Sequence, residues 1–310
     1  MSTWVPRVTP AAGCAGSGRE LARFGDLAVL DAVLLGPVGL PGGAAPRSTL
    51  APSPSGLVHR QAPVLPVDHV VDDLLPWFRA RGLRVVCAVR GSTVGAVSDT
   101  LQRLRRSLDF ATVVGVEIDL AAGREETRPA IGGLTSADPV GSWSADPQAC
   151  LKLLAAARER LPRDLLLQAK LGGECPQPVA AARAAVGGGA RALVLSGAVP
   201  ALTADQFLVG PAVAPVTLGL VTTLRAAIAA GRVPDVPLVA VGGLHDRAGA
   251  LAAHSAGAAG IQVGSGILSD PETLWRVHDA LADAPPPTRD ATAHRTGATT
   301  PDEAGDHDGH

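Results

Sequence analysis

The sequence predicts an α/β fold in which eight parallel strands close into a (β/α)8 barrel, the TIM barrel architecture. Two observations carry this prediction. Short apolar runs alternate with segments of helical apolar spacing from residue 8 to residue 282. The strand-like runs are also apolar on both faces, as in parallel sheets that helices cover. We therefore expect one barrel domain over residues 1–282 and a disordered tail over 283–310, which is rich in Pro, charge and small polar residues.

The expected elements follow from local pattern. Apolar runs predict strands at 8–13, 27–38, 84–91, 113–120, 165–171, 192–199, 238–241 and 260–263. Helical spacing predicts helices at 18–24, 67–82, 94–108, 146–161, 178–189, 214–231 and 271–281, with a further helix capped by Asp246. Segments 39–56 and 121–145 have the Pro, Gly and polar content of loops.

Charge and cysteine content exclude several classes of protein. The net charge of −2 argues against a nucleic-acid or membrane-surface partner held by bulk charge. The sequence has no stretch of 18 uninterrupted apolar residues, so we expect no membrane span. The four cysteines form no CxxC pair and no metal spacing, so we expect a reduced, cytoplasmic setting and no metal site. His307 and His310 lie among acids in the tail, either as weak metal ligands or as solvated side chains.

Two glycine-rich turns near the end of the domain predict a phosphate site. Gly242 and Gly243 follow the run 238–241, and Gly264 and Ser265 follow the run 260–263, each just before a helix. Both turns lie at strand C-termini, so their backbone N–H groups point the same way. The loops after strands 7 and 8 often bind phosphate in this architecture. The alternative is that these glycines only form tight turns.

The order and spacing of six motifs resemble the dihydroorotate dehydrogenase family, most closely its soluble class 1 enzymes. The motifs are AAGCAGSG (11–18), PSGL (54–57), VEIDL (116–120), QAKLG (168–172), FLVGPAVAP (207–215) and QVGSGIL (262–268). The resemblance implies an FMN-dependent oxidoreductase of pyrimidine biosynthesis that forms a homodimer or pairs with a flavoprotein partner subunit. It implies cofactor contacts at Ala12, Gly13, Lys170, Ser196, Gly210, Gly242, Gly243, Gly264 and Ser265.

Lys170 is implied near the pyrimidine edge of the flavin. A cation there would stabilise the negative charge that develops at N1 and O2 when the flavin is reduced. The alternative for this strand lysine is a salt bridge to an acid.

The substrate side departs from the family pattern. Ala122 stands where class 1 enzymes have their cysteine base, and an alanine cannot accept a proton. Asp119 replaces an asparagine, Gly36 replaces a lysine, and His59 replaces the first asparagine of the substrate loop. The catalytic residues therefore stay open, since a site built to hydrogen-bond its ligand loses affinity when those partners vanish.

Several residues are candidates to replace the lost groups. His59, Cys14 and Asp119 could each act on a ligand. The alternative for His59 is a loop histidine, and the alternative for Cys14 is a small side chain that fills a buried space. The alternative for Asp119 is an ion pair with Lys170 or Arg90. His69 flanks the same loop, and Arg124 and Arg128 could grip an anion or be solvated.

Three functions fit these patterns. The first is an FMN oxidoreductase with an altered substrate pocket. The second is a non-catalytic barrel that serves as a binding or assembly module, with or without FMN. The third is a barrel for another phosphorylated small molecule.

Overall fold

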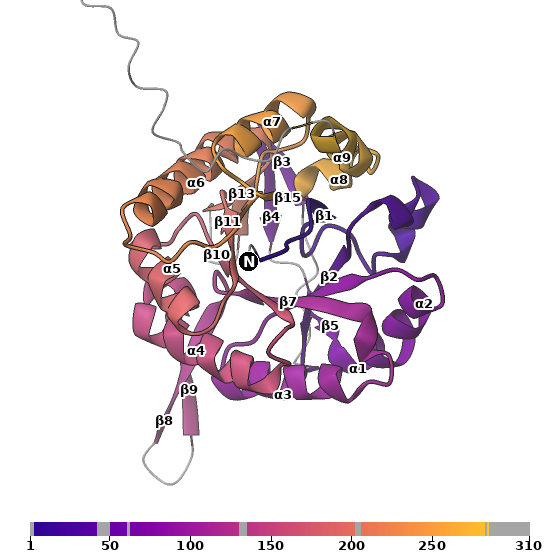
Figure 1. Cartoon of the computed structure of the whole chain (residues 1–310). Coiled ribbons are helices and arrows are strands. Elements are labelled where there is room, and N and C mark those ends of the chain that lie inside the picture. The colour runs from indigo at the N-terminus through magenta and orange to yellow at the C-terminus, as the bar shows by residue number, and fades with distance from the viewer. Residues whose placement is uncertain are drawn as a thin grey trace, which may run out of the picture.

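The computed structural model describes residues 3–41, 50–60, 63–129, 135–201, 206–282 and 284. Its central feature is a curled sheet of nine parallel strands in the order β1-β15-β14-β11-β10-β7-β6-β2-β5. Figure 1 shows the helices arranged as a ring around this sheet, in chain order from purple to yellow. The helices cover the outer face of the sheet, which explains why its strands are apolar on both faces.

The bounds of the parallel strands are close to those expected from the sequence. They are β1 Val8–Pro10, β2 Val33–Gly39, β5 Leu65–Pro66, β6 Val85–Val89, β7 Val113–Asp119, β10 Leu166–Leu171, β11 Ala192–Ser196, β14 Leu238–Val241 and β15 Gly260–Val263. The longer helices are α3 Val94–Arg106, α4 Pro147–Arg160, α5 Pro178–Gly187, α6 Ala214–Ala229, α7 Arg247–Ser255 and α9 Thr273–Ala282. Helix 67–79 is continuous through α1 Val67–His69, the π-turn η3 Val70–Leu74 and α2 Leu75–Arg79.

The two predicted aspartate caps are confirmed. Asp146 accepts hydrogen bonds from the N–H groups of Gln148 and Ala149 at 2.9 and 3.3 Å, and Asp246 accepts one from Gly249 at 2.7 Å. Each carboxylate satisfies donors that the first turn of its helix would leave without partners. Local capping therefore fixes where α4 and α7 begin.

The first and eighth predicted strands pair in parallel as β1 and β15, so the seam of the sheet lies between β1 and the β2–β5 end of the sheet order. Strands β1 and β2 share no ladder among the described residues, but the Gly13 N–H donates a 2.7 Å hydrogen bond to the Gly36 carbonyl. Eight of the nine strands follow one another around the sheet in the order of the predicted barrel strands. The structure thus establishes an α/β fold with a curled parallel sheet.

The expected loops contain antiparallel strands, which corrects the sequence analysis. Strands β3 Leu50–Ser53, β4 Gly56–Arg60, β12 Val199–Pro200 and β13 Gln206–Val209 form a second sheet, and β8 Gly123–Pro129 pairs with β9 Thr135–Ser142. Figure 1 shows the β8–β9 hairpin projecting from the helix ring. Their Pro, Gly and charged residues give no alternating apolar pattern, so only pairing with a distant segment reveals them.

Two further expectations near the N-terminus are wrong. Segment 18–24 forms the 3₁₀ helix η1 Arg19–Arg23 and no α-helix, and the start of the predicted strand 27–38 is the 3₁₀ turn η2 Leu27–Val29. The Asp26 carboxylate accepts a 2.9 Å hydrogen bond from the Ala28 N–H and so turns the chain before β2. The predicted tail lies outside the described residues except for residue 284.

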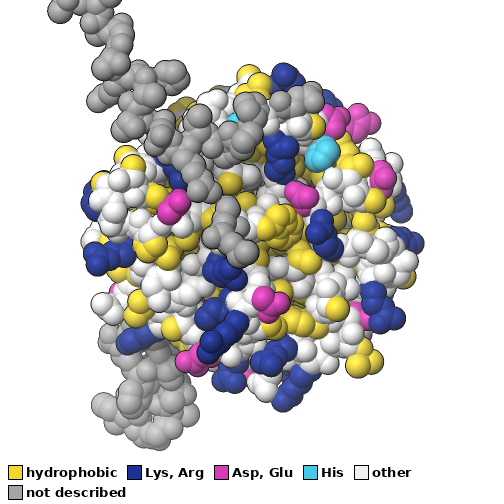
Figure 2. Space-filling view, viewed as in Figure 1, with side chains coloured by type: hydrophobic (Ala, Val, Ile, Leu, Met, Phe, Trp, Pro, Cys, Tyr) yellow, Lys and Arg dark blue, Asp and Glu magenta, His cyan; other side chains and the backbone are white. Residues whose placement is uncertain are grey.

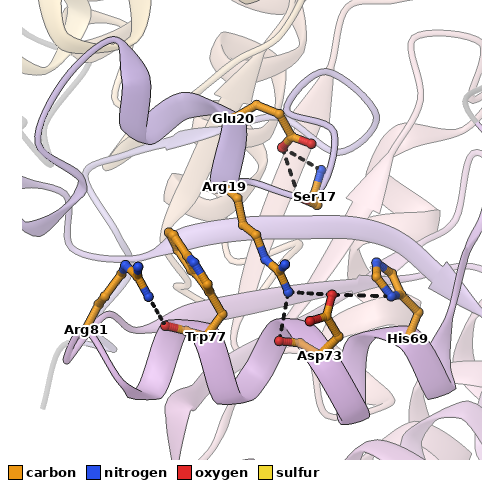
Figure 3. A network of polar contacts seen from close by, with 7 residues as sticks. All are labelled: Ser17, Arg19, Glu20, His69, Asp73, Trp77 and Arg81. Carbon is orange, nitrogen blue, oxygen red and sulfur yellow. Dashed lines mark hydrogen bonds and ion pairs between the residues drawn. The ribbon is translucent and has the colours of Figure 1, made fainter.

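A network of polar contacts holds the loop after β1 against the helix of residues 67–79 (Figure 3). Arg19 of η1 donates a 2.8 Å hydrogen bond to the Asp73 carbonyl and forms a 2.5 Å ion pair with its carboxylate. The guanidinium groups of Arg19 and Arg81 also lie 5.7 and 4.0 Å from the ring centre of Trp77. This network anchors the segment that leads from the predicted flavin turn.

One face of the molecule mixes charge types. Figure 2 shows Lys and Arg side chains in several separate groups, with hydrophobic and acidic side chains between them. Among the described residues, one helical segment, Pro211–Ala229, is long and apolar enough to cross a membrane by length and composition alone, with a mean hydropathy of 1.6. A single such helix is weak evidence for a span. Here α6 packs Val221 and Leu224 into the core.

We predict that two glycines with the same backbone conformation differ in their tolerance of alanine. Gly243 (φ 74°) and Gly231 (φ 68°) are both left-handed, but a Cβ on Gly243 would lie 2.5 Å from the Ala214 nitrogen, whereas Gly231 faces open space. Gly231→Ala should lower the free energy of unfolding by about 1–2 kcal/mol. Gly243→Ala should cost about 1–3 kcal/mol more, because α6 must move. Urea unfolding measures both, and equal losses would contradict the clash.

Candidate functional site

A pocket of about 130 Å³ lies at the C-terminal ends of the parallel strands. We call it the central pocket. The second sheet contributes side chains from β4 and β13, so the pocket is bounded by both sheets. It is lined by Ala11, Ala12, Cys14, His59, Arg90, Asp119, Ala121, Lys170, Gly172, Glu174, Ser196, Ala198, Phe207, Val209, Val241, Gly242, Gly264, Ser265 and Leu268.

A second pocket of about 240 Å³ adjoins the first, and we call it the glycine pocket. It is lined by Gly56, Leu57, Gly210, Pro211, Gly243, Leu244, His245, Gly264, Ser265, Gly266 and Ser269. Gly264 and Ser265 border both pockets. A Cβ on Gly264 would lie only 3.6 Å from the Ala11 Cβ and 3.7 Å from the Cys14 sulfur. The missing side chain therefore leaves space where the two pockets meet.

The structure brings most of the predicted cofactor residues to these two pockets. Ala12, Lys170, Ser196 and Gly242 line the central pocket, Gly210 and Gly243 line the glycine pocket, and Gly264 and Ser265 line both. Gly13 borders neither, because its N–H bonds to the Gly36 carbonyl across the seam. A surface hollow of about 840 Å³ lies elsewhere, against α4, α5 and α6, and contains no strand-end residue.

Lys170 is held by a buried acid. The Glu117 side chain is fully buried, its Oε1 lies 3.7 Å from the Lys170 Nζ, and its Oε2 accepts a 2.5 Å hydrogen bond from Gln262. Burial raises the pKa of Glu117, while Lys170 and Gln262 lower it in part. Lys170 therefore makes the salt bridge that the sequence left as an alternative, while still lining the central pocket.

Asp119 is an ion-pair partner of Arg90, one of the two partners considered from the sequence. Both Nε and Nη2 of Arg90 lie 2.8 Å from the Asp119 Oδ2, and the Ala121 N–H donates to Oδ1 at 3.2 Å. Burial alone would raise the pKa of Asp119, but Arg90 and Lys170 together lower it. A carboxylate stabilised in this way is a weak proton acceptor.

Cys14 and His59 also line the central pocket, and burial shifts their pKa values in opposite directions. Burial raises the pKa of the Cys14 thiol to about 11, although Lys170 lowers it in part, so the thiol stays protonated at neutral pH and is a weak nucleophile. Burial and the nearby Arg90 lower the pKa of His59. His59 is therefore neutral at neutral pH and retains a nitrogen that can accept a hydrogen bond.

Two positions at which the resemblance implies a base and a lysine, Ala122 and Gly36, supply no functional side chain to the central pocket. Ala122, at the place of the cysteine base, is 2% exposed and packs in the hydrophobic core, and it does not line the pocket. A Cβ on Gly36, at the place of the lysine, would lie 2.5 Å from the Ala88 carbonyl oxygen. The side chains at these two positions cannot reach a ligand in this backbone.

Two further candidates, Arg124 and His69, do not line the central pocket. Arg124 forms a 3.1 Å ion pair with Asp146, and His69 lies 3.6 Å from Asp73 on the outer helix (Figure 3). The side chain of Arg128, together with His307 and His310, lies outside the described part of the chain.

The sequence analysis missed Glu174, which lines the central pocket after β10. Both of its carboxyl oxygens are buried, and neither has a hydrogen-bond partner among the described residues. Burial raises the pKa of Glu174 to about 7, with its own backbone N–H lowering the pKa in part and Asp119 adding a small increase. Its position was a usable signal, since acids just beyond the C-terminal end of a barrel strand are often functional.

Comparisons with known proteins point to one family. The chain matches no protein-family model. It is 25% identical over 280 residues to the catalytic subunit of dihydroorotate dehydrogenase B (NAD(+)) from Anoxybacillus flavithermus, covering 85% of this chain and 82% of that protein. The subunit of the same name from Geotalea uraniireducens is 24% identical over 288 residues, with 88% and 87% covered. The one from Geobacillus kaustophilus is 25% identical over 280 residues, with 85% and 82% covered.

We predict that Glu174→Gln stabilises the protein only when the pH is high enough to ionise Glu174. The folded-state pKa of about 7 lies above the ordinary 4.5, so between these values the folded chain keeps a proton that the unfolded chain loses. The free energy of unfolding therefore falls as pH rises through this window. At pH 8 the glutamine variant should be more stable by about 1–3 kcal/mol, and at pH 4 by much less.

Urea unfolding at pH 4, 6 and 8 measures this difference. Glu159→Gln on the exposed side of α4 is the control and should show no gain at high pH. A difference between wild type and Glu174→Gln that does not change with pH would contradict the buried, unpartnered state of Glu174.

Proposed function

We propose that the chain is a divergent member of the dihydroorotate dehydrogenase family, supported by relatives at 24–25% identity, and that it is an FMN-binding oxidoreductase with an altered substrate pocket. The observation that carries the proposal is the pair of joined pockets. Lys170 borders one pocket and glycine turns border the other. A mononucleotide has a flat ring at one end and a phosphate at the other, which matches this arrangement.

We also infer that the curled sheet closes between β1 and β2 as a (β/α)8 barrel. The order of the strands and the hydrogen bond from Gly13 to Gly36 support closure. Closure places every strand C-terminus on one face, where enzymes of this architecture carry their active sites. Both pockets lie on that face.

In this proposal the phosphate lies in the glycine pocket. Gly210, Gly243, Gly264 and Ser265 border it, and the glycines among them let the backbone approach an anion closely. A Cβ on Gly243 would collide with the start of α6, so this turn can be built only with glycine. The sequence prediction of a phosphate site at these turns therefore stands as a proposal with a fitting cavity.

The flavin ring is proposed to lie in the central pocket beside Lys170. Bound FMN would supply the capacity to accept a hydride equivalent from a substrate. Lys170 would place its positive charge at the ring edge, and the Glu117–Gln262 hydrogen bond would hold the ammonium group in place. A side chain fixed in this way costs little reorganisation when negative charge develops.

The substrate of such an enzyme is proposed to differ from dihydroorotate. The position of the family base is occupied by the core residue Ala122, the lysine position by Gly36, and Asp119 is committed to Arg90. General base catalysis is worth about 10²–10⁴ in rate, so its loss would suppress turnover of the family substrate.

A second candidate is a non-catalytic barrel that binds FMN as part of a binding or assembly module. The specific observation in its favour is that Cys14 is held as a thiol and Asp119 is ion-paired, which weakens two of the three sequence candidates for a base. The relatives are described as catalytic subunits. We also propose that the protein is cytoplasmic and forms either a homodimer or a complex with a flavoprotein subunit. Gel filtration and pull-down experiments would distinguish these two assemblies.

We predict that the purified protein binds FMN and that Lys170→Met weakens this binding. A lost charge-assisted contact of about 1.5–3 kcal/mol corresponds to a roughly 10–100-fold rise in the dissociation constant. Absorbance between 300 and 550 nm and titration with FMN measure it. Lys152→Met is a matched control, since Lys152 is the other lysine of the chain and lies exposed on α4. A colourless protein that takes up no added FMN would sink the proposal.

We further predict that dihydroorotate does not reduce the bound flavin. Because Ala122 and Gly36 stand where the family carries its base and its lysine, anaerobic addition of dihydroorotate should leave the flavin absorbance unchanged over minutes, whereas dithionite should bleach it. Bleaching by dihydroorotate at a rate typical of enzymes, on the order of 10 per second, would show that the pocket retains the family reaction.

A further inference from the structure

We propose that Glu174 makes the central pocket selective for a planar ligand head that donates two N–H groups, as an amidinium or a ureide does, and selects against carboxylates. This inference rests on the proposed function, because it names the class of substrate for that same pocket. It follows from three features of the pocket: a carboxyl group without partners among the described residues, cations that are already paired, and apolar side chains in the lining.

The first feature is the state of the Glu174 carboxyl group. Its two oxygens have no hydrogen-bond partner among the described residues and are shielded from solvent. A buried polar group without a partner destabilises the fold, because its hydration is lost and not replaced. Gly172 permits this arrangement, since a Cβ there would collide with the carboxyl oxygens. A ligand that donates hydrogen bonds to the Glu174 oxygens would remove this destabilisation.

The second feature is the distribution of charge around the pocket. The guanidinium of Arg90 is bound to Asp119, and the ammonium of Lys170 lies against Glu117. Gly36 adds no cation from β2. Each cation that lines the pocket is thus matched by an acid, and Glu174 is a further acid. A ligand carboxylate would meet like charge and would have to displace an existing ion pair.

The third feature is the shape and chemistry of the remaining lining. Ala121, Phe207, Val209 and Val241 give the pocket apolar walls, and a flat ring can pack against such walls. A carboxylate accepts two parallel N–H groups in one plane, which is the pattern that an amidinium or a ureide presents. Glu174 would therefore fix both the chemical type and the orientation of the ligand head.

The test compares three compounds that share one ring and differ only in the head group. Benzamidinium offers N–H donors and a positive charge, benzamide offers one donor side and one acceptor, and benzoate offers acceptors alone. Isothermal titration of the full-length protein at pH 8 gives each dissociation constant, after the FMN content of the preparation is recorded. The variants are Glu174→Gln and the exposed control Glu159→Gln.

We expect wild type to bind benzamidinium at least about 10-fold more tightly than benzoate, with benzamide between them. Glu174→Gln should weaken benzamidinium binding by about 10-fold or more, since a charge-assisted pair is lost, and Glu159→Gln should leave it unchanged. Because the glutamine is neutral in the same pocket, it should also reduce the discrimination against benzoate.

Three results would overturn the inference: benzoate binding as tightly as benzamidinium, a Glu174→Gln variant with unchanged affinities, or no binding of any compound up to about 10 mM. These failures are separate from failure of the proposed function. A protein that holds FMN but shows no preference overturns only the role of Glu174. A protein that takes up no FMN overturns the proposed function, and its titration still decides the preference of the pocket.

Discussion

The buried carboxylate of Glu117 is the constraint on which the rest of the site depends. It lies inside the curled sheet on β7, opposite Gln168 of β10 in the ladder and within hydrogen-bond distance of Gln262 on β15. A charge in such a place is costly unless it is paired. Lys170, two residues beyond Gln168 on the same face of β10, supplies the pairing. Lys170 is the only lysine among the described residues that line the pocket, and this ion pair holds it in position before a ligand binds.

The same requirement for pairing organises the next layer of the pocket. Asp119 follows Glu117 by two residues on the same face of β7 and meets Arg90 beyond the end of β6. Two ion pairs, Asp119–Arg90 and Glu117–Lys170, therefore lie at the strand ends. Within each pair, the attraction of the opposite charge makes both side chains less able to take part in proton transfer. Glu174 lies outside both pairs, which is why its protonation behaves differently from that of Asp119. A ligand entering the pocket meets this carboxyl group as a polar group without a hydrogen-bond partner among the described residues.

The second sheet gives the site its other wall. Strands β3, β4, β13 and β12 pair in antiparallel fashion, and the ladder places His59 directly opposite Phe207. Both residues line the central pocket, together with Val209. In the glycine pocket, Gly56 and Gly210 come from the same pair of strands, and their backbones approach each other closely. The segments between the parallel strands therefore shape both ends of the proposed cofactor site, while the parallel strands carry the charges.

The sequence by itself determined the alternation of strands and helices, the aspartate caps and the glycine turns. Each of these depends on a period or a turn that spans only a few residues, so local pattern is enough. The antiparallel strands, the isolation of Glu174 and the use of the Gly13 amide at the seam were decided by tertiary structure. Gln262 and Glu117 are 145 residues apart in the chain, and their hydrogen bond exists only because β15 and β7 face the same interior. Pairing between distant strand ends sets which charges are satisfied and which remain free for a ligand, and no local pattern encodes that.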